Sequence, residues 1–193
     1  MLKILLKISF LFFLVSCKKE LTTIEEKKSE FVKVQINWNP IQFPLEMKIY
    51  ELKSELPHKL WETNTVSSIE KSPLSIEIPN SKLSIQSGRY KEFAMGVKNT
   101  SDSSVYFFAA PHQASPAEYS LGFKFKCLCV NHAFEIPPGE FWYRVVRLSI
   151  SKDFIGENFV IKHDLVGISK ERMKDFSSKK ELNNSHDEHD RLE

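Results

Sequence analysis

The sequence predicts an all-β fold, an antiparallel β-sandwich, from three observations. Apolar and polar residues alternate with a period of two through most of residues 31–168, which is typical of strands buried on one face. Clusters of turn-forming residues interrupt these runs at short intervals. Between the runs there is no helical pattern long enough for the crossover that joins parallel strands. A chain of 193 residues, 41% of them hydrophobic, can bury such a core without disulfide staples.

The predicted strands follow one another along the chain. In the first, residues 31–38, the apolar Val32, Val34 and Ile36 alternate with polar residues. Residues 41–60 are less regular and are interpreted as a strand with an inserted loop. The same period of two predicts further strands at residues 74–78, 83–85, 90–98, 104–109, 119–129, 141–151 and 158–167. Separators rich in Asn, Ser, Asp, Pro and Gly lie at residues 99–102, 111–116 and 137–139.

The N-terminus has the pattern of a secretory signal that ends in a lipid anchor. Two lysines precede an apolar run at residues 8–15, which is shorter than the ~20 apolar residues of a membrane-spanning helix. Residues 1–16 are therefore predicted to be a signal peptide. The sequence Leu-Val-Ser-Cys at residues 14–17 resembles the lipobox of bacterial lipoproteins, in which Cys17 would take the lipid. We expect a membrane-anchored lipoprotein that faces the periplasm or the cell exterior.

Composition divides the rest of the chain into three parts. Residues 17–30 are polar and predict a flexible tether, residues 31–168 hold the predicted strands, and residues 169–193 form a charged tail. The start of this tail is compatible with a short helix, and its end is predicted to be disordered. The net charge of +2 falls to zero once the lysines of the signal peptide are removed, which argues against a nucleic-acid partner.

Two of the three cysteines carry the only chemical motif in the predicted sandwich. Cys127 and Cys129 would lie on one face of the strand 119–129, with their Cα atoms ~6.6 Å apart at ~3.3 Å per residue. This spacing suits two thiolates that hold one soft ion and suits a disulfide poorly. Low-coordinate thiolate sulfur selects Cu(I), whereas zinc requires four ligands, more than a lone C-x-C pair provides. A second copy of the chain facing the first would supply four sulfurs.

The phase of this strand leaves alternatives open. An unbroken alternation would bury both cysteines together with Phe125, as small hydrophobic residues. Leu128 and Val130 would then face water, so the apolar phase is expected to switch near Lys126 through a bulge or strand end that exposes both sulfurs. A metal site, a redox-active disulfide and an inert pair in the core remain the three interpretations.

Histidines offer few further ligands by spacing alone. His132 follows Cys129 by three residues and is a possible additional nitrogen ligand. His58, His112 and His163 show no ligand spacing to one another, so they are expected to be structural or solvated.

The cysteine motif and a later turn together resemble a known family. Cys-Leu-Cys-Val at residues 127–130, followed by Pro-Gly-Glu at residues 138–140, is similar to the Cys-Phe-Cys-Phe and Pro-Gly-Glu signature of the CtaG family. Asn-Thr-Ser-Asp at residues 99–102 resembles that family's Asn-x-Ser/Thr-Asp turn, and Ser-Pro at residues 115–116 resembles its Thr-Pro step. The resemblance spans residues 83–168, about half of the chain.

The resemblance implies a function in the assembly of cytochrome c oxidase. The CtaG family has an immunoglobulin-like sandwich, binds Cu(I) through the cysteine pair, associates through copper and delivers the metal to the CuB centre. By resemblance, Cys127 and Cys129 would be the ligands, the catalytic subunit of a haem-copper oxidase the client, and a copper-bridged homodimer a possible state. The chain departs from the family at Leu128 and Val130, where phenylalanines are usual, and its lipobox replaces a membrane helix.

Two other functions stay open. A cupredoxin-like electron carrier would need two histidines, one cysteine and usually a methionine around copper. A surface lipoprotein whose sandwich only scaffolds an envelope complex would need no metal. An enzyme is not expected, since the sequence has no nucleophile elbow, phosphate-binding glycine loop or H-E-x-x-H motif.

Overall fold

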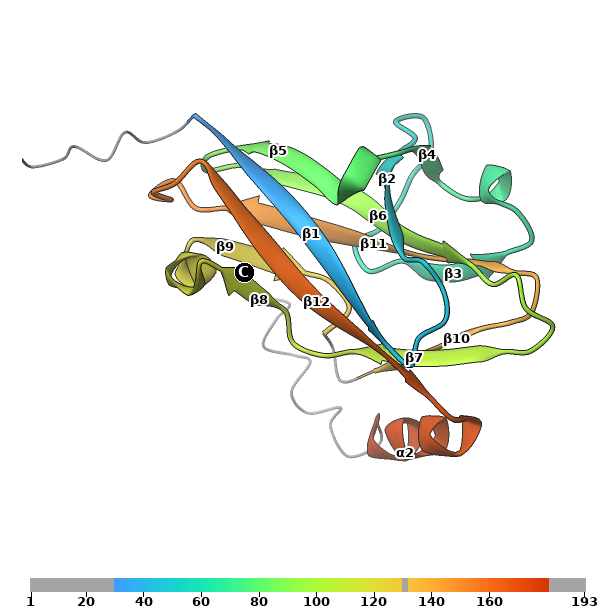
Figure 1. Ribbon diagram of the computed structural model, residues 1–193. Helices are drawn as coiled ribbons and strands as arrows, with labels where there is room; N and C mark the ends of the chain where they lie inside the picture. The colour runs from blue at the N-terminus through green and yellow to red at the C-terminus, as the bar shows by residue number, and fades with distance from the viewer. Residues whose placement is uncertain (1–29, 130–131, 181–193) are drawn as a thin grey trace, which may run out of the picture.

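A computed structural model describes residues 30–129 and 132–180 of the chain. This part folds into two β-sheets packed face to face, followed by one α-helix (Figure 1). The sandwich predicted from the alternation is therefore confirmed. The elements are β1 Phe31–Ile41, β2 Lys48–Leu52, β3 Thr63–Val66, β4 Leu74–Glu77, β5 Lys82–Gln86, β6 Tyr90–Lys98, β7 Val105–Ala109, β8 Gln113–Ser115, β9 Phe123–Lys126, β10 Ala133–Ile136, β11 Phe141–Ile150, β12 Asn158–Ile168 and α2 Lys170–Lys180, with 3-10 turns at Ile69–Lys71, Pro79–Ser81 and Ala117–Leu121.

Each sheet is built around a long strand. The first sheet has the order β10-β7-β12-β1-β5, with β8 also paired to β12, and the second has the order β3-β11-β6-β2-β4, with β9 also paired to β11. All pairs are antiparallel except β1 and β12, which run parallel with Trp38 opposite His163. The sandwich is thus mixed at one pair of strands, where only antiparallel pairing was expected.

Along one edge of β12, and likewise of β11, two short strands pair one after the other. Along β12, β8 pairs as far as Lys162 and β7 pairs from Leu165 onward, which leaves residues 163–164 between them. Along β11, β3 pairs as far as Arg144 and β9 pairs from Arg147 onward, which leaves residues 145–146 between them. We call these two interruptions the edge gaps. At the gap of β12 the segment between β7 and β8 leaves the first sheet, and at the gap of β11 the segment that follows β9 leaves the second sheet.

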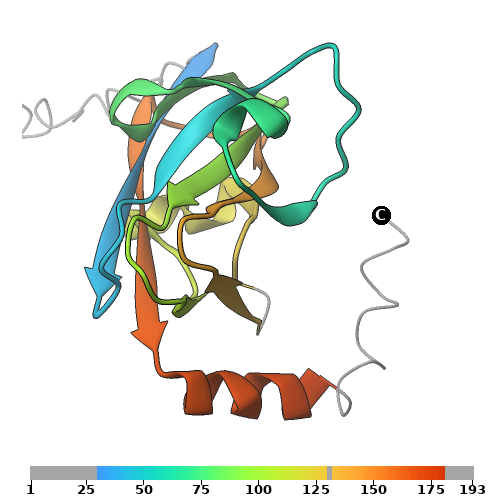
Figure 2. The same ribbon diagram turned by 90° about the vertical axis from the view of Figure 1, so that its right-hand side faces the viewer.

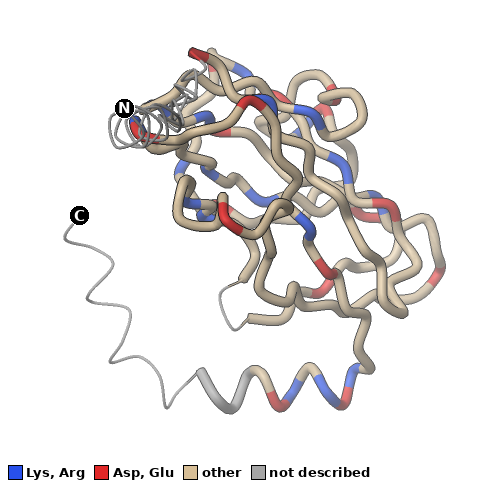
Figure 3. The backbone as a smooth tube through the Cα atoms, turned by 60° about the vertical axis from the view of Figure 1, so that its left-hand side comes forward, with Lys and Arg blue, Asp and Glu red and all other residues tan. Residues whose placement is uncertain are grey.

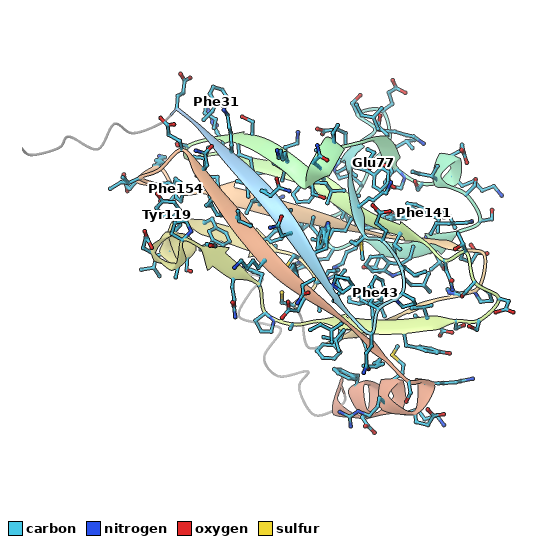
Figure 4. All side chains as sticks on the ribbon, viewed as in Figure 1. Phe31, Phe43, Glu77, Tyr119, Phe141 and Phe154 are labelled. Carbon is cyan, nitrogen blue, oxygen red and sulfur yellow. The ribbon has the colours of Figure 1, made fainter. Side chains whose placement is uncertain are left out.

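The core lies between the sheets and follows the alternation. Val32, Val34 and Ile36 of β1 are buried while their neighbours in sequence are more exposed. Apolar side chains fill the space between the layers in Figure 4, where Phe43 is labelled among them. The largest fully buried members include Phe93, Met95, Phe107, Trp142, Leu148 and Ile161. Burying one side chain of this kind contributes about 1.5–3 kcal/mol, so these contacts hold the sheets together.

The prediction of a single strand over residues 119–129 is wrong. Residues 117–121 form a 3-10 turn, and the strand β9 begins only at Phe123. Tyr119 turns inward and packs against Phe154, with ring centroids 5.0 Å apart, as Figure 4 shows at one end of the sandwich. Gly122 lets the backbone approach the ring of Phe154 closely, because a Cβ at this position would lie 2.3 Å from that ring. Aromatic packing therefore replaces strand pairing in this segment.

The turns at 99–102 and 137–140 are joined by one buried side chain. Asn99 has no exposed surface, and its Nδ2 donates hydrogen bonds to the carbonyl oxygens of Ser103 and Ile136 at 2.8 and 2.9 Å. Its Oδ1 accepts from the backbone N–H and the hydroxyl of Ser101. Gly139 has a φ of 71°, a left-handed conformation that glycine adopts without strain. The Asn-Thr-Ser-Asp and Pro-Gly-Glu motifs of the family resemblance thus form turns of the fold.

Helix α2 follows the end of β12 and lies across one end of the sandwich (Figure 2). Its contact with the sheet includes Phe176 and Phe108, whose ring centroids are 5.2 Å apart. Lys170–Lys180 thus occupies the start of the segment expected to be a charged tail, as the short helix considered there. No helix in the described ranges is long and apolar enough to cross a bilayer. The predicted signal peptide, Cys17 and nearly all of the predicted tether lie outside the described residues.

Charged residues of both signs are interspersed along the chain (Figure 3). Most are exposed, and the ion pairs at the surface include Lys48 with Glu77 and Glu92 with Arg147. One exception, Arg144, lies in the interior next to the site described below.

Candidate metal centre

Four side chains from distant parts of the sequence meet at the edge gaps. They are Cys127, Cys129, His112 and His163, and their sulfur and nitrogen atoms all lie within 4.8 Å of one another. His163 comes from β12, His112 immediately precedes β8, and the cysteines follow β9. Sulfur and imidazole nitrogen are the ligands that proteins use for zinc and copper. The group could hold a metal ion.

The strand β12 places His163 in the interior. Phe159, Ile161 and Leu165 share its inward face, and His163 itself has no exposed surface. Its ring lies 5.6 Å from that of Trp38 and 6.2 Å from that of Phe125, measured between centroids. Packing therefore fixes the imidazole with its Nε2 directed at the two sulfurs.

His112 reaches the same point because the chain leaves the sheet between β7 and β8. The N–H of Ala110 still bonds to the carbonyl of Asp164 at 3.1 Å, so this segment stays alongside the edge gap of β12. The ring of His112 packs against those of Phe123 and Phe125, with centroids 5.8 and 5.4 Å away. His112 is only half-buried, so it stands between the buried ligands and solvent.

The cysteines lie in the segment that leaves the edge gap of β11. The strand β9 ends at Lys126, as the change of apolar phase predicted. The expected exposure of both sulfurs is wrong, however, because Cys127 is 3% exposed and only Cys129 is half-buried. The chain turns inward after Lys126 and buries Leu128 completely. The backbone carbonyl of Cys127 accepts a hydrogen bond from Nε of Arg144 at 3.2 Å, which anchors this inward turn.

The distances between the four ligand atoms suit one ion. Nε2 of His163 lies 3.3 Å from Sγ of Cys127 and 3.5 Å from Sγ of Cys129. Nδ1 of His112 lies 3.4 Å from Sγ of Cys129 and 3.5 Å from Sγ of Cys127. Ligands at ordinary Zn–S and Zn–N bond lengths stand about 3.4–3.8 Å apart around a tetrahedral ion. Small adjustments would bring all four atoms onto a common metal.

The two sulfurs are not bonded to each other. They lie 3.3 Å apart, well beyond a disulfide bond, and both cysteines are free. A hydrogen bond from Cys127 stabilises the thiolate of Cys129 and lowers the pKa of Cys129, although burial acts against it. That same hydrogen bond, together with burial, raises the pKa of Cys127. Metal binding to both sulfurs must therefore displace the proton held by Cys127.

One atom of the cluster has no partner within the described structure. Nδ1 of His163 is buried and makes no hydrogen bond with any described residue. Leaving a buried polar atom unpaired costs about 1–3 kcal/mol, so a histidine that served packing alone would be a poor choice here. Nε2, the other ring nitrogen, faces the two sulfurs. This arrangement fits a histidine that serves as a metal ligand.

Sequence reasoning found the cysteines and missed both histidines. His112 and His163 were expected to be structural or solvated, but they complete the cluster. The alternation along β12 puts His163 in phase with Ile161 and Leu165, and this was a usable signal. No local signal marks His112, which lies in the loop between β7 and β8. His132, the possible extra ligand, packs with its ring 5.0 Å from that of Phe134 and is not part of the group of four.

The two histidines change what the cluster can bind. Two thiolates alone argued against zinc, because zinc takes four ligands, and that argument no longer holds. Two imidazoles with at least one thiolate also supply the equatorial ligands that a cupredoxin-like centre needs. The observed donor set fits zinc or copper, and one chain provides all four donors without a second copy.

Comparison with known proteins assigns a family to the sandwich but not a role. No curated protein and no solved structure matches the chain. A family described as a domain of unknown function, DUF8709, matches residues 32–168, which run from the first strand of the sandwich to its last. Because the match covers more than half of the sequence, the chain belongs to the DUF8709 family.

Proposed function

We propose that this protein is a copper carrier that holds Cu(I) in the cluster of Cys127, Cys129, His112 and His163. The observation that carries the proposal is the convergence of two thiol and two imidazole ligands within 4.8 Å. Thiolate sulfur is soft and favours Cu(I), and imidazole also binds copper well. The metal here is cargo, so no catalytic step is required.

The unequal burial of the ligands supports transfer from one side. Cys127 and His163 are buried, whereas Cys129 and His112 are half-buried. An incoming thiolate or imidazole would reach the ion from the side of Cys129 and His112 and displace these ligands first. The buried pair would hold the ion until the acceptor has bound it. Cu(I) would thus pass between sites without release into solvent.

The proposed client is the catalytic subunit of a haem-copper oxidase, and the proposed destination is its CuB centre. The similarity of the cysteine segment and the Pro-Gly-Glu turn to the CtaG family supports this choice. A lipid anchor at Cys17 would keep the domain close to a membrane-embedded acceptor on the extracytoplasmic side. Four donors in one chain make a copper-bridged homodimer unnecessary for coordination, so we propose that a single chain carries the ion.

A second candidate is an electron carrier, and the two histidines favour it. His112 and His163 with one cysteine match the equatorial ligands of a blue copper site. The carbonyl oxygen of Ala110 lies 3.4 Å from Sγ of Cys129, in reach of the weak axial position that such sites fill with a backbone oxygen or methionine. Strong visible absorption after addition of Cu(II) would favour the electron carrier, and a stable, colourless Cu(I) form would favour the carrier of cargo.

Anaerobic titration with Cu(I) against a chromophoric chelator tests the proposal. The full chain, reduced and purified in detergent, is expected to bind one Cu(I) per chain. Cys127→Ser with Cys129→Ser should abolish competition with the chelator, because hydroxyl oxygen is a poor ligand for Cu(I). His132→Ala is the matched control, a histidine close to the cysteines but outside the cluster, and should bind as the wild type does.

Two outcomes would contradict the proposal. Equal Cu(I) affinity of the double cysteine variant and the wild type would leave only a scaffolding sandwich. Oxidase activity in membranes of cells that carry the double variant tests the client separately. Unchanged oxidase activity there, with copper binding lost in vitro, would remove the oxidase from the proposal and retain the copper site.

A further inference from the structure

Arg144 is a charged residue on the interior face of the sandwich. Along β11 it is in phase with Trp142, Val146 and Leu148, which all belong to the core between the sheets. It is 8% exposed, and of the residues whose burial the structure describes it is the buried one with a permanent charge. Arginine stays protonated in proteins, so a positive charge is held beside the core.

Arg144 makes two hydrogen bonds, but neither of them brings a negative charge to its guanidinium. Nε donates to the carbonyl of Cys127 at 3.2 Å, and a terminal nitrogen donates to the hydroxyl of Thr63 at 2.6 Å. The guanidinium lies over the ring of Phe134, 5.5 Å from its centroid. Among the described residues no carboxylate forms an ion pair with it. A buried charge without a counterion is costly, so a partner of opposite charge is expected nearby.

The cysteine pair supplies that opposite charge once a metal ion binds both sulfurs and displaces the proton of Cys127. Arg144 is also hydrogen-bonded to the backbone of that same cysteine, so its position depends on the segment that carries the sulfurs.

Charge balance then distinguishes between metals. Two thiolates and two neutral imidazoles around Cu(I) carry one net negative charge, which the guanidinium neutralises. The same ligands around a divalent ion carry no net charge, so Arg144 would remain an unbalanced cation beside the site. Resting on the proposed function, we propose that Arg144 is the countercharge that makes the cluster prefer Cu(I) to divalent ions. It acts as a positioning and specificity-determining residue and does not touch the metal.

Substitution at this position separates charge from packing. Arg144→Met removes the charge and retains much of the apolar stem, Arg144→Lys retains the charge, and Arg144→Gln retains a donor for the carbonyl of Cys127. Arg147→Met is the matched control, because Arg147 lies on the same strand, faces the other side and pairs with Glu92. Affinities for Cu(I) and for Zn(II) are measured by chelator competition on the full chain, and circular dichroism of the metal-free proteins checks folding.

The expected result is a change in the ratio of the two affinities. Arg144→Met and Arg144→Gln should lower the preference for Cu(I) over Zn(II) by about tenfold or more, as loss of a partner beyond the ligands commonly does. Arg144→Lys should retain most of the preference, and Arg147→Met should stay within about twofold of the wild type because its charge is screened by solvent. If Arg144→Met does not fold, Arg144→Gln against Arg144→Lys gives the same comparison.

The countercharge and the proposed function fail in different ways. A wild-type chain that prefers Cu(I), with the same preference in Arg144→Met and Arg144→Gln, would overturn the countercharge and leave the copper carrier. Equal losses in Arg144→Lys and Arg144→Met would show a packing role and also overturn it. A wild-type chain that binds Zn(II) in preference to Cu(I), or neither ion, would overturn both.

Discussion

The sandwich buries a polar cluster around Asn99 and a cysteine–histidine cluster, and the two differ in how completely their hydrogen bonds are satisfied. Around Asn99 the donors and acceptors are matched: the amide nitrogen donates to both turns, and the amide oxygen accepts from Ser101. In the cysteine–histidine cluster two imidazoles and two sulfurs face a common point, and one nitrogen of His163 has no partner within the described structure. Burial demands polar satisfaction in both places. Around Asn99 the matched partners serve the fold, whereas the four ligand atoms that converge in the cysteine–histidine cluster are available to a metal ion.

The largest effect on stability is expected at Asn99. Asn99→Leu should lower the free energy of unfolding by about 3 kcal/mol, because the carbonyls of Ser103 and Ile136 lose buried donors. Denaturant titration measures the loss. Asn39→Ala is the matched control, since Asn39 is exposed and its bond to Asp164 should contribute less than about 0.5 kcal/mol.

Cu(I) binding by the Asn99→Leu variant tests whether the two clusters are independent. Folded Asn99→Leu should bind Cu(I) as tightly as the wild type, because the turns it joins contain none of the four ligands. Weaker binding in the folded variant would show that the two clusters are coupled, and the division between a structural and a ligand-binding cluster would be lost.

Copper itself is expected to have the next largest effect. Free Cu(I) at about 100 times its dissociation constant should stabilise the folded chain by about 2.7 kcal/mol, because the unfolded chain does not hold the four ligands together. Thermal unfolding under anaerobic, reducing conditions reports the gain. Cys127→Ser with Cys129→Ser should show none, and an equal gain in that variant would place the copper elsewhere.

A smaller effect of opposite sign is expected at His163. His163→Leu removes the unpaired Nδ1 and places an apolar side chain in the core. It should therefore stabilise the metal-free protein by about 1 kcal/mol. The same change should weaken Cu(I) binding, since one of the four ligands is lost. Chemical denaturation without metal is the measurement. A loss of stability would mean that the imidazole contributes to the fold as Asn99 does.

Much of the sandwich is predictable because its strands repeat a simple pattern. Val32, Val34 and Ile36 alternate in sequence and in burial, and β6 was predicted with the bounds that the structure has. The short strands β3, β8 and β10 were missed, since their sequences TNTV, QAS and AFEI show no sustained alternation of apolar and polar residues. The parallel pairing of β1 with β12 depends on residues far apart in the chain, and no local pattern encodes it.

The site was predictable only where its residues are close in sequence. Cys127 and Cys129 form a local motif and were found, whereas the contact with His163 spans a large separation and depends on how β12 is placed. The inward phase of His163 was available in the sequence, but the pairing that gives it two sulfurs was not. The burial of Cys127 was mispredicted because the apolar Leu128 was taken as a switch of phase that exposes the sulfurs, whereas the chain beyond β9 buries both residues.

X-ray absorption at the copper edge of the Cu(I)-loaded full chain tests the central claim most directly. The account predicts sulfur and imidazole nitrogen together in the coordination shell, with the imidazole signal lost in a variant carrying His112→Ala and His163→Ala. A shell of sulfur alone, or of oxygen and nitrogen without sulfur, in the wild-type chain would contradict it.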